Sequence, residues 1–198
     1  VGDAYFVGGV DTATTSPHTM VEVNNALYNS VIRSALDQAV ERFVYVSSAM
    51  VYERATVFPT SEADLAGTAI PASVYGFSKL MGEVAVRAAH TEHGFPYTIC
   101  RPFNAYGPGE RVAGEPAAAH LVLDVIRKCL AIDPAAPTPL TIIGDGSQTR
   151  TLTHIDDVAD GIVAAMGAPA GLHEDFNIAA TEELSVAEIA RLIWEQCG

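Results

Sequence analysis

A short run of β-branched and aromatic residues, Val44-Tyr45-Val46, ends in two serines, Ser47 and Ser48. A continuous apolar run of this kind predicts a strand that is buried on both faces, as in a parallel sheet covered by helices. Ligands of open α/β sheets bind beyond the carboxyl ends of the strands. The sequence therefore predicts an α/β fold in which Ser48 lies at the ligand-binding edge of the sheet.

A tyrosine and a lysine stand four residues apart in the stretch Ser73-Val74-Tyr75-Gly76-Phe77-Ser78-Lys79, at the start of a predicted helix. This spacing places the side chains of Tyr75 and Lys79 on one helix face. A neighbouring ammonium favours the tyrosinate, so we expect the pKa of the Tyr75 phenol to fall from its ordinary value of about 10. The pair therefore predicts a general acid–base centre for proton transfer.

Apolar residues at helical spacing predict amphipathic helices over residues 20–40, 74–93, 117–131 and 185–196, and short apolar runs predict strands over 4–7, 42–48, 97–101, 140–143 and 176–178. Gly94 is expected to cap the second helix, and Ser185 with Glu188 forms the capping signature of the last. Asp156 and Asp157 precede a further helical series and fit an N-cap and a first-turn carboxylate better than a catalytic pair.

The composition narrows the possible class of protein. With 198 residues and 49% apolar content, the chain can bury the core of one domain or one and a half. Its net charge of −13 argues against a nucleic-acid or anionic-membrane partner. The sequence holds no apolar run of about 18 residues and no signal peptide, so we expect a cytoplasmic location. Cys100, Cys129 and Cys197 are widely spaced and are expected to be reduced thiols rather than metal ligands.

Several stretches match one protein family in its own order: Ser48–Tyr52, Tyr75–Lys79, Arg101–Gly109, Gly144–Arg150 and Phe176–Ile178. On these motifs the chain resembles the extended short-chain dehydrogenase/reductase family, in its NAD-dependent nucleotide-sugar epimerase/dehydratase branch. The matches run across nearly the whole chain, which is more specific than any single motif.

The resemblance implies a Rossmann-like parallel sheet that lacks its first strands, with a smaller substrate-binding lobe. Residues 1–102 would form the C-terminal half of the dinucleotide-binding domain, and 103–198 mainly the substrate lobe, with the strand near 176–178 returning to the main sheet. The glycine fingerprint G-x-x-G-x-x-G, which cradles the pyrophosphate in this family, is absent from the sequence. We therefore expect the chain to begin after the adenosine-binding half, and either to end before the last part of the substrate lobe or to belong to a variant with a shorter lobe.

The resemblance also implies site residues. The catalytic ones are Ser48, Tyr75 and Lys79; those that bind NAD are Gly8, Gly9, Asn24, Tyr75, Lys79 and Phe103; those that bind substrate are Asn104, His120, Leu121 and Arg150. Arg150 would bind the diphosphate, because an arginine fork recognises phosphate oxygens in pairs. No metal is implied.

The function that follows is an NAD-dependent epimerase of a nucleoside-diphosphate sugar, with C4 inversion of a UDP-hexose through a 4-keto intermediate. Related dehydratases place an Asp-Glu pair directly after the catalytic hydroxyl residue, where this chain has Ala49 and Met50. A nucleotide-sugar 4,6-dehydratase, an NAD(P)-dependent carbonyl reductase and a catalytically silent dinucleotide-binding sensor remain as alternatives. The implied partner is a nucleotide sugar, and a homodimer is one candidate for the assembly. The sugar, the base, the choice of NAD over NADP and the oligomeric state stay open.

Overall fold

The computed structural model describes residues 16–110, 120–133, 135–136 and 138–197 of the chain. The predicted strand at 4–7, with Gly8 and Gly9 after it, lies outside these residues.

The largest sheet in the described part of the chain is a parallel one with the strand order β1-β2-β6. Its strands are β1 (Phe43–Val46), β2 (Tyr97–Pro102) and β6 (Asp175–Ile178). In the register of the sheet, Val46 pairs with Cys100, and Cys100 pairs with Phe176 on its other side. The strand near 176–178 therefore lies in the main sheet, and the carboxyl ends of the three strands lie at one edge.

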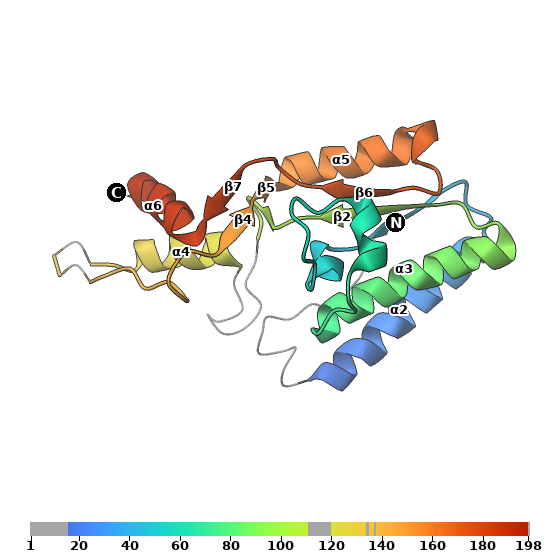
Figure 1. Ribbon diagram of the computed structural model, residues 1–198, viewed down its shortest axis with the longest axis horizontal. Helices are drawn as coiled ribbons and strands as arrows, with labels where there is room; N and C mark the ends of the chain where they lie inside the picture. Colours follow the sequence, from blue (N-terminus) through green and yellow to red (C-terminus); the bar gives the residue numbers. More distant parts are fainter. Residues whose placement is uncertain (1–15, 111–119, 134, 137, 198) are drawn as a thin grey trace.

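Helices cover both faces of this sheet. Helices α2 (Pro17–Asp37) and α3 (Val74–His93) lie side by side on one face, and α5 (Ile155–Gly167) covers the other (Figure 1). The main core forms where α2 and α3 meet β1 and β2, and it contains Tyr28, Ile32, Ala35, Tyr45, Val86, Ala89, Phe95, Tyr97 and Ile99. The predicted Rossmann-like α/β class is confirmed.

Helix α3 has the bounds that the sequence predicts. The side chain of Ser73 accepts a hydrogen bond from the Gly76 amide and caps the first turn. Gly94 ends the helix in the left-handed conformation, with φ of 69°. Such a backbone angle strains any residue with a Cβ, so glycine suits this position.

A smaller lobe lies at one end of the sheet (Figure 1). Its elements are β3 (Ala105–Tyr106), α4 (Leu121–Leu130), β4 (Thr149–Thr151), β5 (Thr153–His154), β7 (Glu183–Ser185) and α6 (Val186–Cys197). Strand β3 pairs in parallel with β5, and β4 pairs antiparallel with β7. Helices α4 and α6 pack together around a small core of Val125, Cys129 and Ala190.

Two predicted elements differ from the structure. The predicted strand at 140–143 is wrong: Leu140 and Ile142 lie in irregular backbone and pack against the α4–α6 core, so their burial does not come from strand pairing. The predicted N-cap role of the Asp156-Asp157 pair is also wrong. The residue that caps α5 is His154, whose Nδ1 accepts a hydrogen bond from the Asp156 amide at 3.3 Å.

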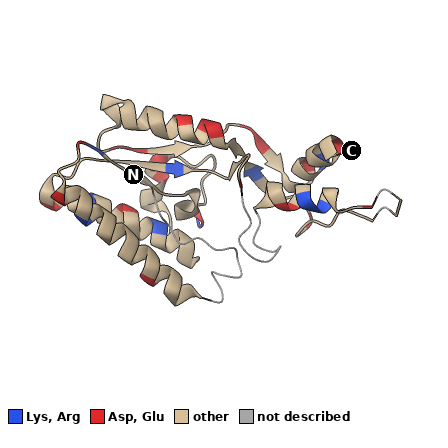
Figure 2. Cartoon of the chain, turned by 180° about the vertical axis from the view of Figure 1, so that it is seen from behind, with Lys and Arg blue, Asp and Glu red and all other residues tan. Residues whose placement is uncertain are grey.

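Charged groups complement the helix ends. Asp156 and Asp157 lie in the first turn of α5, and Arg127 with Lys128 lies in the last turn of α4 (Figure 2). Each placement opposes the partial charge of its helix end. The predicted capping box of α6 is confirmed, since the Glu188 amide donates to Ser185 Oγ and the Ser185 amide to Glu188 Oε2. None of the helices in the described ranges is long and apolar enough to cross a membrane.

Candidate active site

Lys79 lies at the carboxyl end of β1. Its side chain is only 4% exposed, and Nζ donates a hydrogen bond to the Val46 carbonyl oxygen at 2.9 Å. The same ammonium lies 6.0 Å from the centre of the Tyr75 ring, one helical turn earlier on α3. The predicted geometry is confirmed: the Tyr75 phenol and the Lys79 ammonium lie on one face of α3. They lie at the carboxyl end of β1, the edge at which sheets of this kind bind ligands.

Ser48 begins the short 3-10 helix η1 (Ala49–Tyr52), which directly follows β1. Its Oγ accepts a hydrogen bond from the Met50 amide at 3.2 Å. Helix α3 approaches this turn closely at Gly76, where an added Cβ would lie 2.6 Å from the Met50 carbonyl oxygen. A glycine is needed here because any side chain would push α3 away from the turn. The fold thus brings Ser48, Tyr75 and Lys79 to one end of β1.

Two of the predicted cofactor residues flank this group. Asn24 is fully buried, and its Nδ2 donates to Ser78 Oγ at 3.2 Å, so it holds α2 against α3 instead of facing solvent. Ser78 Oγ in turn donates to the Tyr75 carbonyl at 3.0 Å. Phe103 follows β2 and lies half-buried beside the Tyr52 ring, with ring centres 6.0 Å apart. Cofactor contacts of Asn24 and Phe103 stay predictions.

The donors at the end of β1 fit the nicotinamide–ribose half of NAD. The phenol of Tyr75, the ammonium of Lys79 and the hydroxyl of Ser48 are groups that can bind ribose hydroxyls and a carboxamide. Ser47 directly precedes Ser48, and its Oγ is buried without a hydrogen-bond partner within the described ranges. The pyrophosphate half has no glycine-rich cradle in this sequence.

The predicted substrate residues lie toward the smaller lobe. Asn104 is exposed, adopts φ of 38°, and donates from Nδ2 to the Thr151 carbonyl at 3.1 Å. This contact places Asn104 next to β4, which carries the exposed Arg150. The Arg150 guanidinium donates to the Thr149 carbonyl at 2.7 Å. The structure therefore brings Asn104 and Arg150 to neighbouring segments.

His120 and Leu121 lie at the start of α4. His120 is exposed, and its Nδ1 lies 2.9 Å from Glu110 Oε1. Leu121 is half-buried and packs against the α4–α6 core. These contacts account for both side chains without a ligand, so their substrate roles stay predictions. Among the described residues no group of three or more His, Cys, Asp or Glu side chains comes together that could hold a metal ion.

A charge cluster centred on the buried pair Arg101–Glu83 lies beneath the site and belongs to none of the motifs that predict the catalytic residues. Arg101 is fully buried on β2 and binds Glu83 of α3 twice, through Nε at 2.9 Å and Nη2 at 2.7 Å. Its Nη2 also lies 2.6 Å from Asp175 Oδ2 on β6. Its Nη1 donates to the Tyr52 hydroxyl at 2.7 Å. Two features of the sequence indicate such a cluster: an arginine inside an apolar strand, and a glutamate four residues after Lys79.

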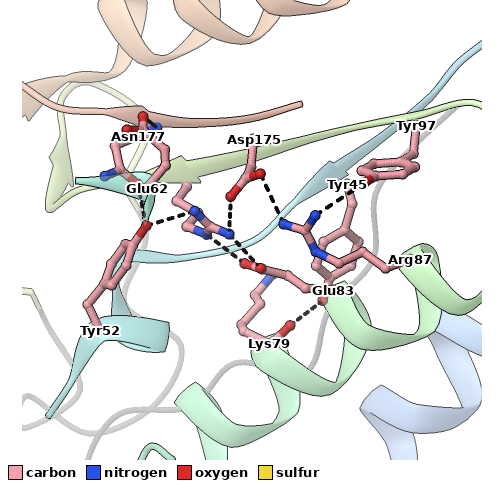
Figure 3. Close-up of polar contacts among 10 residues, drawn as sticks. Tyr45, Tyr52, Glu62, Lys79, Glu83, Arg87, Tyr97, Asp175 and Asn177 are labelled. Atoms are coloured by element: carbon pink, nitrogen blue, oxygen red, sulfur yellow. Dashed lines mark hydrogen bonds and ion pairs between the residues drawn. The ribbon is translucent and has the colours of Figure 1, made fainter. Parts of the chain in front are cut away.

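The cluster balances its charges internally. Arg87 Nη2 lies 3.0 Å from Asp175 Oδ1, so two arginines face two carboxylates (Figure 3). Burial alone would raise the pKa of Asp175, but the charge of Arg101 and the hydrogen bond from Arg87 outweigh it and lower that pKa. Burial also raises the pKa of the Tyr52 phenol, against the opposing charge of Arg101. The Tyr52 hydroxyl therefore stays neutral, accepts from Arg101 and donates to Asn177 Oδ1 at 3.0 Å.

Comparisons with known proteins agree with this architecture. The family described as "NAD dependent epimerase/dehydratase family" matches residues 3–179. GDP-L-fucose synthase 1 of Arabidopsis thaliana is 27% identical over 194 residues, which cover 97% of this chain and 59% of that protein.

Two solved structures show the same fold. Epimerase Mth375 of Methanothermobacter thermautotrophicus superposes with a TM-score of 0.86 at 28% identity, over 98% of this chain and 55% of that one. UDP-glucose 4-epimerase of Thermotoga maritima, solved with UDP-glucose, gives a TM-score of 0.83 at 26% identity, over 99% of this chain and 60% of that one. The chain thus spans less than two thirds of the length of these relatives. With a family match over most of its residues and this shared Rossmann-like fold, the chain belongs to the NAD-dependent epimerase/dehydratase family.

Proposed function

We propose that the protein is an NAD-dependent epimerase that inverts C4 of a nucleoside-diphosphate hexose, with a UDP-hexose as the first candidate. The observation that carries the proposal is the placement of Lys79, buried at the end of β1 and one turn from Tyr75. A buried lysine beside a phenol, next to the turn that begins at Ser48, is suited to general acid–base catalysis at a substrate hydroxyl.

Each residue then has a defined task. Tyr75 takes the proton of the sugar 4-hydroxyl and later returns it, while the Lys79 ammonium stabilises the negative charge on the phenol. Ser48 donates a hydrogen bond to the same sugar oxygen. NAD, when bound beside these residues, would supply the acceptor for the C4 hydride and its return to the opposite face. Phe103 and Asn24 line the cofactor side, and Asn104, His120, Leu121 and Arg150 bind the nucleotide sugar.

The relatives support a nucleotide-sugar substrate and leave its base for experiment. One solved relative holds UDP-glucose, whereas the name of another refers to GDP-L-fucose. Assays of the full-length protein therefore start with UDP- and GDP-hexoses in parallel. The silent-sensor alternative is less favoured because the fold keeps Ser48, Tyr75 and Lys79 at one end of β1.

The acid–base test replaces Tyr75 by Phe. This change removes the proton acceptor but keeps the ring, so we expect kcat to fall by about 10²–10⁴ with little change in KM. A matched control is Tyr97→Phe, because Tyr97 lies at the opposite end of its strand from the site. Full turnover by the Tyr75→Phe enzyme would remove Tyr75 from the mechanism.

Turnover in D₂O separates the epimerase from the 4,6-dehydratase. Elimination of water requires a second acid–base set, and Ala49 and Met50, directly after Ser48, carry no ionisable group. We therefore expect the recovered sugar to contain no deuterium on carbon, because epimerisation by hydride transfer would exchange no carbon-bound hydrogen with the solvent. Deuterium at C5 or C6, detected by NMR or mass spectrometry, would contradict the epimerase assignment and support the 4,6-dehydratase instead.

A further inference from the structure

Tyr52 connects the buried charge cluster to the turn that carries Ser48. It is the last residue of η1, which begins directly after Ser48. Its hydroxyl lies between two polar groups of the sheet, accepting from Arg101 at 2.7 Å and donating to Asn177 at 3.0 Å. The side chain is 6% exposed, so these hydrogen bonds are shielded from water and are correspondingly strong.

Arg101 holds the helix of the acid–base pair with the other side of its guanidinium. Glu83, which it binds twice, lies one turn after Lys79 on α3. The same rigid, planar group therefore contacts both elements of the site, the η1 turn through Tyr52 and α3 through Glu83. A bidentate arginine pair restricts orientation as well as distance.

We propose that the Tyr52 hydroxyl is a positioning group for the reaction: bound to Arg101, it fixes the turn that begins at Ser48 relative to the helix that carries Tyr75 and Lys79. This inference rests on the proposed function. Tyr52 acts through Ser48 and touches no reacting atom in this mechanism. Because the reacting groups must stay aligned within a fraction of an ångström, a loosened turn slows the chemical step more than it weakens substrate binding.

The same segment is held at a second place. Asn177, which accepts the hydrogen bond of the Tyr52 hydroxyl, donates from its backbone amide to Glu62 Oε1 at 2.7 Å and from Nδ2 to the Thr60 carbonyl at 3.1 Å. Glu62 begins the 3-10 helix η2 (Glu62–Gly67). The segment between β1 and α3 is thus anchored to β6 through Asn177, which contacts both Tyr52 and Glu62 (Figure 3). Of these links, Tyr52 is the nearest to Ser48 in the sequence.

Tyr97 provides a matched control within the same cluster. Its hydroxyl accepts a hydrogen bond from Arg87 at 3.2 Å, and its side chain is 5% exposed, close to the value for Tyr52. It begins β2, at the end of the sheet opposite to the site. Tyr52→Phe and Tyr97→Phe therefore each remove one buried hydroxyl from an arginine, but only Tyr52 belongs to the turn after Ser48.

The experiment compares these two variants of the full-length protein with the wild type. For Tyr52→Phe we expect kcat to fall by about 10- to 100-fold with KM within about twofold, as for a small misalignment of reacting groups. The amides of Val51, Glu53 and Ala55, which are hydrogen-bonded within the turn, should exchange with deuterium about 10- to 100-fold faster. Tyr97→Phe should leave both kcat and this exchange at the wild-type values.

The outcomes separate this inference from the proposed function. A Tyr52→Phe enzyme with wild-type kcat and wild-type exchange in the turn overturns the positioning role while leaving the epimerase assignment intact. Equal losses of kcat in both variants also overturn it, because they would reflect general stability. If the wild type turns over no nucleotide sugar, the proposed function fails, and the exchange measurement still decides whether Tyr52 holds the turn.

Discussion

Asp175 keeps its negative charge inside the fold because two arginines surround it. Its pKa lies below the ordinary value despite burial, which by itself acts in the opposite direction. Removing one partner from such a cluster leaves the remaining charge unpaired in the fold. The free energy lost in this way is much larger than the free energy that the intact pair contributes to stability. Its contribution to stability therefore depends on the carboxylate remaining ionised.

This dependence predicts how stability varies with pH. A carboxyl whose folded pKa is lowered stabilises the protein fully above its unfolded pKa of about 3.9, and the contribution disappears as pH falls through the folded pKa. We expect the free energy of unfolding of the wild type to exceed that of Asp175→Asn at pH 6, and the difference to shrink below about pH 4. Urea denaturation at a series of pH values measures it.

Asp145 offers a control for the pH series. Its pKa is also lowered, through hydrogen bonds from the side chain and amide of Ser147, but it lies in an exposed turn. Asp145→Asn should therefore change stability far less than Asp175→Asn at pH 6. A difference between wild type and Asp175→Asn that stays constant from pH 6 to pH 3 would contradict the ionised state.

The spacing predicts that Tyr75 and Lys79 share one face of α3, because a separation of four residues on a helix is a local geometric relation. It could not predict the surroundings of Asn24, because a helix sequence does not tell which neighbour covers its polar side; α3 does so here through Ser78. Arg101 could be recognised as unusual in an apolar strand. Its partner Asp175 lies far along the chain and becomes visible only once β6 joins the sheet.

At the scale of elements, the same distinction separates helix α3 from the wrongly predicted strand at 140–143. The cap residues Ser73 and Gly94 mark the ends of α3 locally, so its bounds follow from the sequence. A strand also requires a partner strand, and β7 pairs with β4 instead of with the apolar residues 140–143. Apolar residues can equally be buried as a loop, as Leu140 and Ile142 are.

Gly82 controls how closely α3 lies on β1. An added Cβ would come within 1.9 Å of the Tyr45 hydroxyl, which donates to the Lys79 carbonyl at 3.2 Å. We expect Gly82→Ala to destabilise the protein by about 1–3 kcal/mol, as overpacking does, although alanine favours helices. The midpoint of urea denaturation measures the change.

Gly167 is the matched control for this substitution. It ends α5, and no atom lies within 4 Å of an added Cβ. Gly167→Ala should leave the denaturation midpoint unchanged or raise it slightly. If Gly82→Ala were equally harmless, Tyr45 would have to move aside without cost, and the close packing of α3 on β1 would not matter for stability.

At the scale of the molecule, the two regions differ in the size of their cores. Within the described residues, nine side chains are buried together between α2, α3 and the sheet, whereas three are buried between α4 and α6. Since stability follows buried apolar contacts, the smaller lobe should open more easily than the sheet.

Native-state hydrogen exchange tests this difference. Amides of β2, such as that of Ile99, should exchange only with global unfolding, and amides in α4 and α6 should exchange at a lower free energy of opening. Val125→Ala should speed exchange in α4 and α6, because Val125 is 1% exposed at their contact, and leave β2 unchanged. A parallel acceleration in β2 would show that the lobes unfold as one unit.

The order of strands in the sheet has a consequence for biosynthesis. β6 pairs with β2, yet the ribosome makes it several seconds later at the usual rate of about 5–20 residues per second. During that interval β2 is an open edge, and of the two carboxylates of the finished cluster only Glu83, the partner of Arg101, has been made. Arrival of Asp175 closes the edge and neutralises the second arginine in the same event. We therefore expect the nascent chain to be most prone to edge-to-edge association while the segment between β2 and β6 is being translated.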